Sequence, residues 1–166
     1  LLTLHWLNAG FMVGILIPNK CAESVAAVFD RLYAELGPEL FARLFPVILT
    51  DRGTEFSNPS RIEFDKAGKR RTWVFFCNQK SQLERNHEIV REILPKGVSF
   101  DALTQEQAHL ALSHVNAYVR YVQGNRTPFE VFEFLYGEGS AAKLHIAKID
   151  PKKVVLKPRL VGIEMK

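Results

Sequence analysis

The order of two hydrophobic periodicities along the chain limits its fold more than any other feature. Alternating and β-prone apolar residues fill positions 1–7 and 10–17, which are separated by a turn that contains Gly10, and this pattern predicts two paired strands. Residues 22–36 instead place apolar side chains at helical spacing and are followed by Gly37 and Pro38, which predicts one amphipathic helix ending there.

Further strands and helices are predicted along the rest of the chain. Strands are predicted over 47–51 and 71–76, a hairpin or loop over 61–70, and helices over 82–94, over 104–121 and after Thr127-Pro128. The aromatic residues recur at strand or helix spacing and are therefore predicted to be core side chains rather than platforms for bases: Trp73, Phe75, Phe76, Phe129, Phe132 and Phe134. The whole order predicts a mixed α/β domain without internal repeats.

Composition excludes several classes of protein. With 166 residues, 47% hydrophobic and 24% charged, the chain suits one globular domain. Its apolar runs are far shorter than the roughly 20 residues that span a bilayer, so we expect no membrane association. Two cysteines, Cys21 and Cys77, form neither a disulfide framework nor a metal-binding cluster, which favours a reducing compartment, the cytoplasm.

Positive charge is concentrated at the C-terminal end. From Lys143 onward there are seven basic and two acidic residues, so this segment carries +5 while the whole chain carries +4. Such a segment could contact a polyanion such as DNA, or could simply be a solvated end of the chain. A short strand is a further possibility over residues 154–158.

Acidic residues mark two predicted element ends. The run ILTDRGTEF places Asp51 at the end of a buried strand, next to Gly53 and ahead of a second acid, Glu55. Glu84 falls in the first turn of a predicted helix, with 32 residues between it and Asp51. If the preceding strands are neighbours, Asp51 and Glu84 can face one cleft, where carboxylate oxygens suit Mg²⁺ or Mn²⁺. The alternatives are a turn-forming Asp and a Glu that stabilises the positive end of a helix.

Three segments together resemble one family. ILTDRGTEF, LERNHEIVREILPKG and GNRTPFEVFEFLYG, in this order, are similar to the catalytic core of insertion-sequence transposases and retroviral-type integrases, the D…D…E family. The resemblance implies an α/β fold of the ribonuclease H-like type, a mixed sheet flanked by helices. It covers residues 1–137, which we expect to form the catalytic core, and leaves 138–166 as a basic C-terminal extension.

The resemblance implies a function and a site. Asp51 matches the second metal-binding carboxylate and Glu84 the third, with Glu88, one helical turn further on, as the reserve ligand. The activity implied is Mg²⁺- or Mn²⁺-dependent DNA cleavage and strand transfer by a homo-oligomer in the bacterial cytoplasm, at the nucleoid. We expect DNA contacts from nearby basic side chains and one histidine: Arg52, Arg70, Arg71, Lys80, Arg85 and His87. The alternatives are a mobile surface loop around Arg70 and Arg71 and an ordinary surface histidine at His87.

Three departures qualify the resemblance. Arg52 stands where the family commonly has Asn, and Ser81 stands near a position where the family often has Gly. The family's first Asp lies in a strand before the one that begins here at Leu1, and no acid precedes Glu23. We therefore expect a chain that lacks the first strand and has little strand-transfer activity alone. The alternative function is a non-catalytic DNA-binding or oligomerisation module on the same fold.

Overall fold

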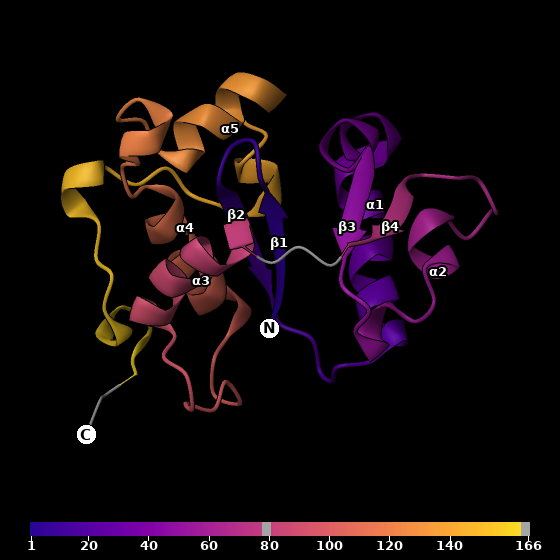
Figure 1. The fold of residues 1–166 in the computed structure, drawn as a ribbon, viewed down its shortest axis with the longest axis horizontal. Helices are drawn as coiled ribbons and strands as arrows, with labels where there is room; N and C mark the ends of the chain where they lie inside the picture. Colours follow the sequence, from indigo (N-terminus) through magenta and orange to yellow (C-terminus); the bar gives the residue numbers. More distant parts are fainter. Residues whose placement is uncertain (78–80, 164–166) are drawn as a thin grey trace. The chain divides into compact units, whose positions relative to one another are not determined.

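The computed structural model describes residues 1–77 and 81–163, and for 81–86 it describes the backbone alone. The protein is mixed α/β, as predicted. It divides into two compact units: the hairpin unit, Leu1–Leu16 with Lys80–Lys166, and the parallel unit, Ile17–Gln79 (Figure 1). In the described part of the chain, none of the helices has the length and apolar character needed to cross a bilayer.

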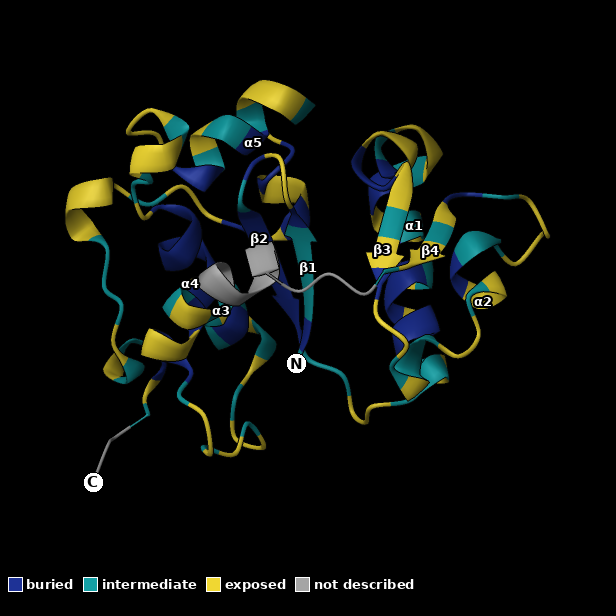
Figure 2. Ribbon diagram, viewed as in Figure 1, coloured by how far each residue is buried: buried dark blue, intermediate teal, exposed yellow. Residues whose placement is uncertain are grey.

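An antiparallel pair of strands organises the hairpin unit. β1 (Leu2–Trp6) pairs with β2 (Phe11–Ile15), which confirms the two strands predicted from the sequence. The turn is closed by a 3.1 Å hydrogen bond from the Ala9 amide to the Trp6 carbonyl. Every residue of β2 is buried (Figure 2), because α4 and α5 both pack against this strand.

Three helices complete this unit: α3 (Ser81–Ile93), α4 (Gln105–Asn116) and α5 (Pro128–Tyr136). α4 and α5 each begin with a capping box, in which a threonine hydroxyl and a side chain three residues later bond each other's backbone amides. α4 ends earlier than the predicted 104–121. Its last residue, Asn116, is buried and bonds both the amide and the carbonyl of Met12 at 2.9 and 2.7 Å, which fixes β2 to the helix end.

Aromatic side chains form part of the core of the hairpin unit. The Phe11 and Phe132 rings stack with centroids 3.9 Å apart, and Trp6 meets both rings edge-on. Phe132 is buried as predicted. The prediction of core positions is wrong for Trp73, Phe75, Phe76 and Phe134, whose side chains are exposed.

The C-terminal segment, residues 138–163, belongs to the hairpin unit. It runs through the short 3-10 turns Ala142–Leu144, Pro151–Lys153 and Pro158–Val161, and the last of these packs against α3 and α4. Residues 154–158 form no strand in the structure. The described part of the basic segment is therefore folded onto helices of its own unit and is not a free arm.

The parallel unit joins one bent helix to two parallel strands. α1 (Ala22–Leu44) is interrupted at Gly37, whose φ of 75° lies in the left-handed region that glycine tolerates, just before Pro38. The predicted helix end is thus confirmed, and a second helical stretch follows the bend. β3 (Val47–Thr50) pairs in parallel with β4 (Trp73–Phe76). The predicted hairpin or loop contains a short helix, α2 (Ser60–Glu63).

Candidate metal site

Asp51 lies where the structure ends the pairing of β3. The last residue pair of the two strands joins Thr50 to Phe76, and the chain then turns. The turn is closed by the Asp51 carboxylate, whose Oδ1 accepts a 3.0 Å hydrogen bond from the Gly53 amide. Asp51 itself is exposed. The predicted exposed acid at a strand end is therefore confirmed, but the prediction of a buried strand is wrong, because Val47 and Leu49 are exposed.

Gly53 leaves room between two carboxylates. Its φ of −61° is one that any residue adopts, so the glycine is not needed for backbone conformation. A Cβ atom at this position would instead lie 2.5 Å from Oε2 of Glu55 and 3.0 Å from Oδ1 of Asp51. The missing side chain thus allows both carboxylates to approach the same point.

Glu55 is the site residue that the sequence did not assign. It lies in the 3-10 turn Thr54–Phe56, with its side chain 12% exposed. Its Oε1 forms a 3.1 Å ion pair with Lys20, whereas its buried Oε2 accepts no hydrogen bond from any described residue. The signal was present in the run ILTDRGTEF, since Glu55 is the second acid after the strand, but its proximity to Asp51 depends on the turn.

These oxygens suit a divalent cation. A hard ion such as Mg²⁺ takes carboxylate oxygens and fills its other positions with water or phosphate, and a buried oxygen without a hydrogen bond is a natural ligand. Among the side chains that the structure describes, no group of three or more His, Cys, Asp or Glu has a metal-binding arrangement. Asp51 and Glu55 therefore provide a partial ligand set, which further oxygen ligands would complete.

Glu84 occupies the predicted place in its helix. It is the fourth residue of α3, in the first turn, and belongs to the hairpin unit, whereas Asp51 belongs to the parallel unit. The side chains of Glu84 and Arg85 lie outside the described part of the structure, as does Lys80 entirely. Glu88, the reserve ligand, is exposed on the same helix.

His87 is half-buried in the hairpin unit. Its Nε2 lies 3.3 Å from the hydroxyl of Thr3 on β1, and burial together with the nearby Arg91 guanidinium lowers its pKa. Both residues line an open cavity of about 380 Å³ that also includes Arg91 and Lys96 over an apolar floor. His87 is therefore largely neutral at pH 7, so any contact with phosphate there would be a hydrogen bond rather than an ion pair.

The predicted DNA contacts of the parallel unit differ in accessibility. Arg52, next to Asp51, is exposed. Arg70 is one-third exposed and already engaged: it pairs with Glu63 at 3.1 Å, and its guanidinium lies 3.8 Å from the centre of the Trp73 ring. Of these two side chains, Arg52 is the one free to meet an incoming phosphate.

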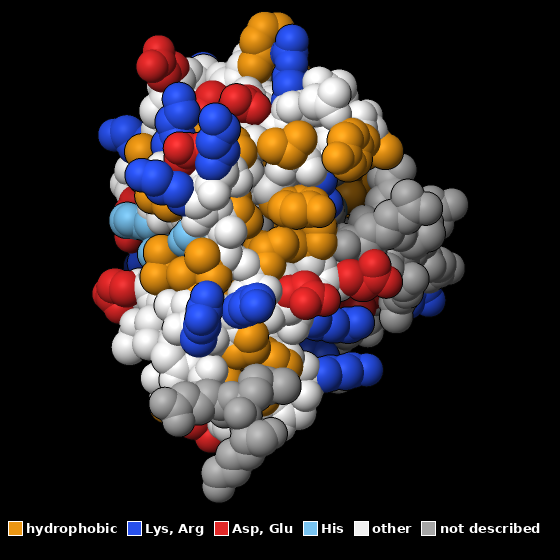
Figure 3. All heavy atoms as spheres, turned by 90° about the vertical axis from the view of Figure 1, so that its left-hand side faces the viewer, with side chains coloured by type: hydrophobic (Ala, Val, Ile, Leu, Met, Phe, Trp, Pro, Cys, Tyr) orange, Lys and Arg blue, Asp and Glu red, His pale blue; other side chains and the backbone are white. Residues whose placement is uncertain are grey.

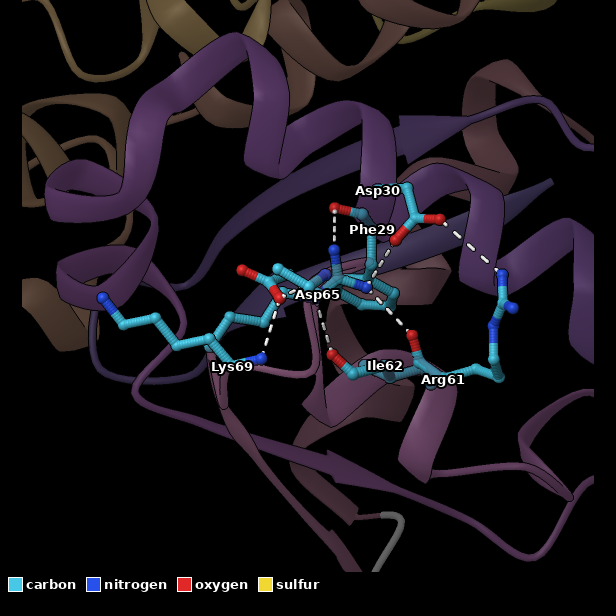
Figure 4. Close-up of polar contacts among 8 residues, drawn as sticks. Phe29, Asp30, Arg61, Ile62, Asp65 and Lys69 are labelled. Atoms are coloured by element: carbon cyan, nitrogen blue, oxygen red, sulfur yellow. Dashed lines mark hydrogen bonds and ion pairs between the residues drawn. The ribbon is translucent and has the colours of Figure 1, made fainter.

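Arg71 is a structural residue and not a surface contact. Its side chain is 1% exposed and bonds Asp30 at 2.8 Å. Nη2, which pairs with Asp30, also donates to the Arg61 carbonyl at 2.9 Å, while Nε and Nη1 donate to the Ile62 and Phe29 carbonyls at 2.9 and 3.3 Å; these partners are labelled in Figure 4. The prediction that Arg71 contacts DNA is wrong, because the side chain is buried and each of its three nitrogens has a partner inside the unit.

Comparisons with known proteins add no relative. No family model matches the chain, and neither a curated protein nor a solved structure matches it.

Proposed function

We propose that this chain is the catalytic core of a DNA transposase or integrase of the D…D…E class, on a ribonuclease H-like fold, which cleaves and joins DNA with Mg²⁺ or Mn²⁺. The observation that carries the proposal is Asp51 at the end of a parallel strand, beside a glycine that keeps space open next to a second carboxylate. The three motifs, in their order and spacing, support the same assignment.

Each residue has a defined part in this proposal. The resemblance assigns Asp51 and Glu84 as the second and third metal-binding carboxylates. Glu55 contributes to the same cation as Asp51 through Oε2, which accepts no hydrogen bond from a described residue. The bound ion supplies activation of the nucleophile, water or a DNA 3′-hydroxyl, and neutralises charge on the phosphate. Arg52 and His87 orient DNA phosphates by charge and by hydrogen bonding respectively. Lys20 pairs with Oε1 of Glu55, which would leave Oε2 available to a cation.

Metal titration tests the proposal. Calorimetry with Mn²⁺ on the chain is compared with Asp51→Asn, Glu55→Gln and Glu84→Gln, which keep side-chain size while removing charge. We expect each to weaken binding by about tenfold or more. Glu39→Gln and Asp101→Asn, exposed carboxylates away from the motifs, serve as matched controls and should bind as the unchanged chain does.

A fourth variant tests the geometry directly. Gly53→Ala has an allowed backbone conformation but places a methyl group 2.5 Å from Oε2 of Glu55, so it should weaken Mn²⁺ binding without removing a charge. If Asp51→Asn and Glu84→Gln leave binding unchanged, the catalytic proposal fails and the non-catalytic DNA-binding or oligomerisation module becomes the better reading. If Glu84→Gln alone leaves Mn²⁺ binding unchanged, Glu88 is the ligand to examine.

A further inference from the structure

The C-terminal segment, residues 138–163, has a surface that the metal site does not use. α4 holds the backbone of this segment through three side chains. Ser113 and His114 accept hydrogen bonds from the amides of Ala147 and Val155 at 2.9 and 3.1 Å, and Gln107 donates one to the carbonyl of Val161 at 3.1 Å. The segment is thus fixed at three points along its length.

Exposed cations alternate along the sequence with these fixed points. They are Lys143, Lys148, Lys152, Lys153, Lys157 and Arg159. None of the six forms an ion pair with a described residue, and the acids of the described segment are Glu138 and Asp150. Figure 3 looks onto the side of the hairpin unit where this segment lies and shows Lys and Arg side chains gathered in groups there.

We propose that this segment binds the phosphodiester backbone of double-stranded DNA without reading its sequence. Cations fixed in place by a folded backbone lose less conformational freedom on binding than cations on a flexible tail. The choice of DNA among polyanions rests on the proposed function. The surface lies apart from the carboxylates of the metal site in the sequence, and its binding requires no metal.

An anionic membrane is the competing partner, and the structure disfavours it. Interfacial binding to lipid needs an apolar face that inserts between headgroups. In this segment the large apolar side chains Leu144, Ile146 and Val161 are turned inward and are at most 3% exposed. Ile149, Val154, Val155 and Leu156 are partly exposed, but the described part of the segment contains only 3-10 turns of three or four residues and no amphipathic helix that could lie in the surface of a bilayer. The surface therefore matches DNA better than a bilayer.

The test measures the salt dependence of DNA binding by the whole chain. A labelled duplex of about 20 base pairs is titrated by fluorescence anisotropy in EDTA, at salt from about 0.05 to 0.2 M. The triple variant Lys152→Gln, Lys153→Gln, Lys157→Gln is compared with Arg31→Gln, Arg43→Gln, Lys66→Gln, which removes the same charge from exposed positions of the parallel unit. Circular dichroism confirms that both variants remain folded.

The expected result is specific to the first variant. Loss of three phosphate contacts should reduce the slope of log affinity against log salt by about 2.7 and weaken binding roughly tenfold or more at low salt. The control should keep the original slope. Equal losses in both variants, no loss in the first, or no DNA binding by the unchanged chain would overturn the proposal.

An additional arm separates the competing explanations. Vesicles rich in phosphatidylserine should not bind the chain, and binding to them with no effect of the triple variant on DNA would assign the surface to a membrane. Because DNA binding is measured in EDTA, its outcome does not depend on the metal site. Failure of the metal site and failure of the DNA surface are thus measured independently.

Discussion

The two units bury their strands in different ways. In the hairpin unit β2 is buried at every position, as Figure 2 shows. In the parallel unit one face of the strand pair consists of Val47, Leu49, Trp73 and Phe75, which are between 48% and 55% exposed. Parallel strands are usually covered on both faces. The strand pair alone therefore cannot explain how the parallel unit holds its shape.

A cluster of buried polar contacts around Arg71 stabilises the parallel unit in addition to its strand pair. Arg71 joins α1, through Asp30 and the Phe29 carbonyl, to the segment around α2, through the carbonyls of Arg61 and Ile62. Both units also pack aromatic side chains, Phe11 against Phe132 in the hairpin unit and Phe41 against Phe45 in the parallel unit. Among the described residues, the Arg71 cluster is thus an addition to the apolar core of the parallel unit, and it predicts a sensitivity to mutation that aromatic packing does not.

Removing the cluster should have the largest effect. Arg71→Ala leaves three carbonyls and one carboxylate without their donor, so we expect the parallel unit to lose about 3–5 kcal/mol of stability. Arg71→Lys keeps a charge opposite Asp30 but loses the planar fork, and its loss should be smaller. The measurement is urea unfolding combined with hydrogen exchange of peptides from α1 and α4.

Arg43→Ala, an exposed arginine on the same helix, provides the control and should change stability by about 0.5 kcal/mol or less. Faster exchange is expected in α1 peptides first. A loss below about 1 kcal/mol for Arg71→Ala would show that the cluster is not what stabilises this unit.

Acidification should have the second-largest effect, and it should lower the stability of the hairpin unit more than that of the parallel unit. All five histidines lie in the hairpin unit, and burial, with smaller contributions from His87 and Arg120, lowers the pKa of His5 to about 4. An unfolded histidine takes up a proton near pH 6.5 while native His5 does not, so stability is present above pH 6.5 and is lost as pH falls toward 4. The loss should be on the order of 2 kcal/mol, after allowance for solvent screening.

His5→Gln tests whether His5 causes this loss of stability at low pH. The variant removes the titrating group, so the fall in stability of the hairpin unit between pH 6.5 and 4 should become shallower, though not absent, because burial also lowers the pKa of His87 and His114. Hydrogen exchange at several pH values gives the result for each unit. A pH dependence of equal steepness in α1 peptides would contradict the assignment of the effect to histidines.

Local sequence signals predicted where helices and strands begin and end better than they predicted which side chains are buried. Thr127 and Pro128 marked the start of α5, and Gly37 marked the bend in α1, because caps and breakers act within one turn. The same reasoning placed Asp51 at the end of a strand. These are features that neighbouring residues determine, so a pattern along the chain contains them.

Long-range contacts account for what was missed. Arg71 was predicted to lie on the surface because it is charged, and its burial depends on Asp30, which is 41 positions away. Phe75 was predicted to be core because it is aromatic and in a strand, yet no described residue covers it fully. The role of Glu55 followed from a turn that brings it beside Asp51. None of these outcomes is encoded in periodicity.

The exposed strand face gives the smallest expected effect and the sharpest test of the comparison. Phe75→Ser removes a side chain that is 53% exposed, so we expect the stability of the parallel unit to change by no more than about 0.5 kcal/mol. Phe29→Ala, at a position 1% exposed in the same unit, should cost about 3–5 kcal/mol, because it leaves a cavity. Urea unfolding measures both. A loss for Phe75→Ser that approached that of Phe29→Ala would mean that this face is covered in solution, and the contrast between the units would then disappear.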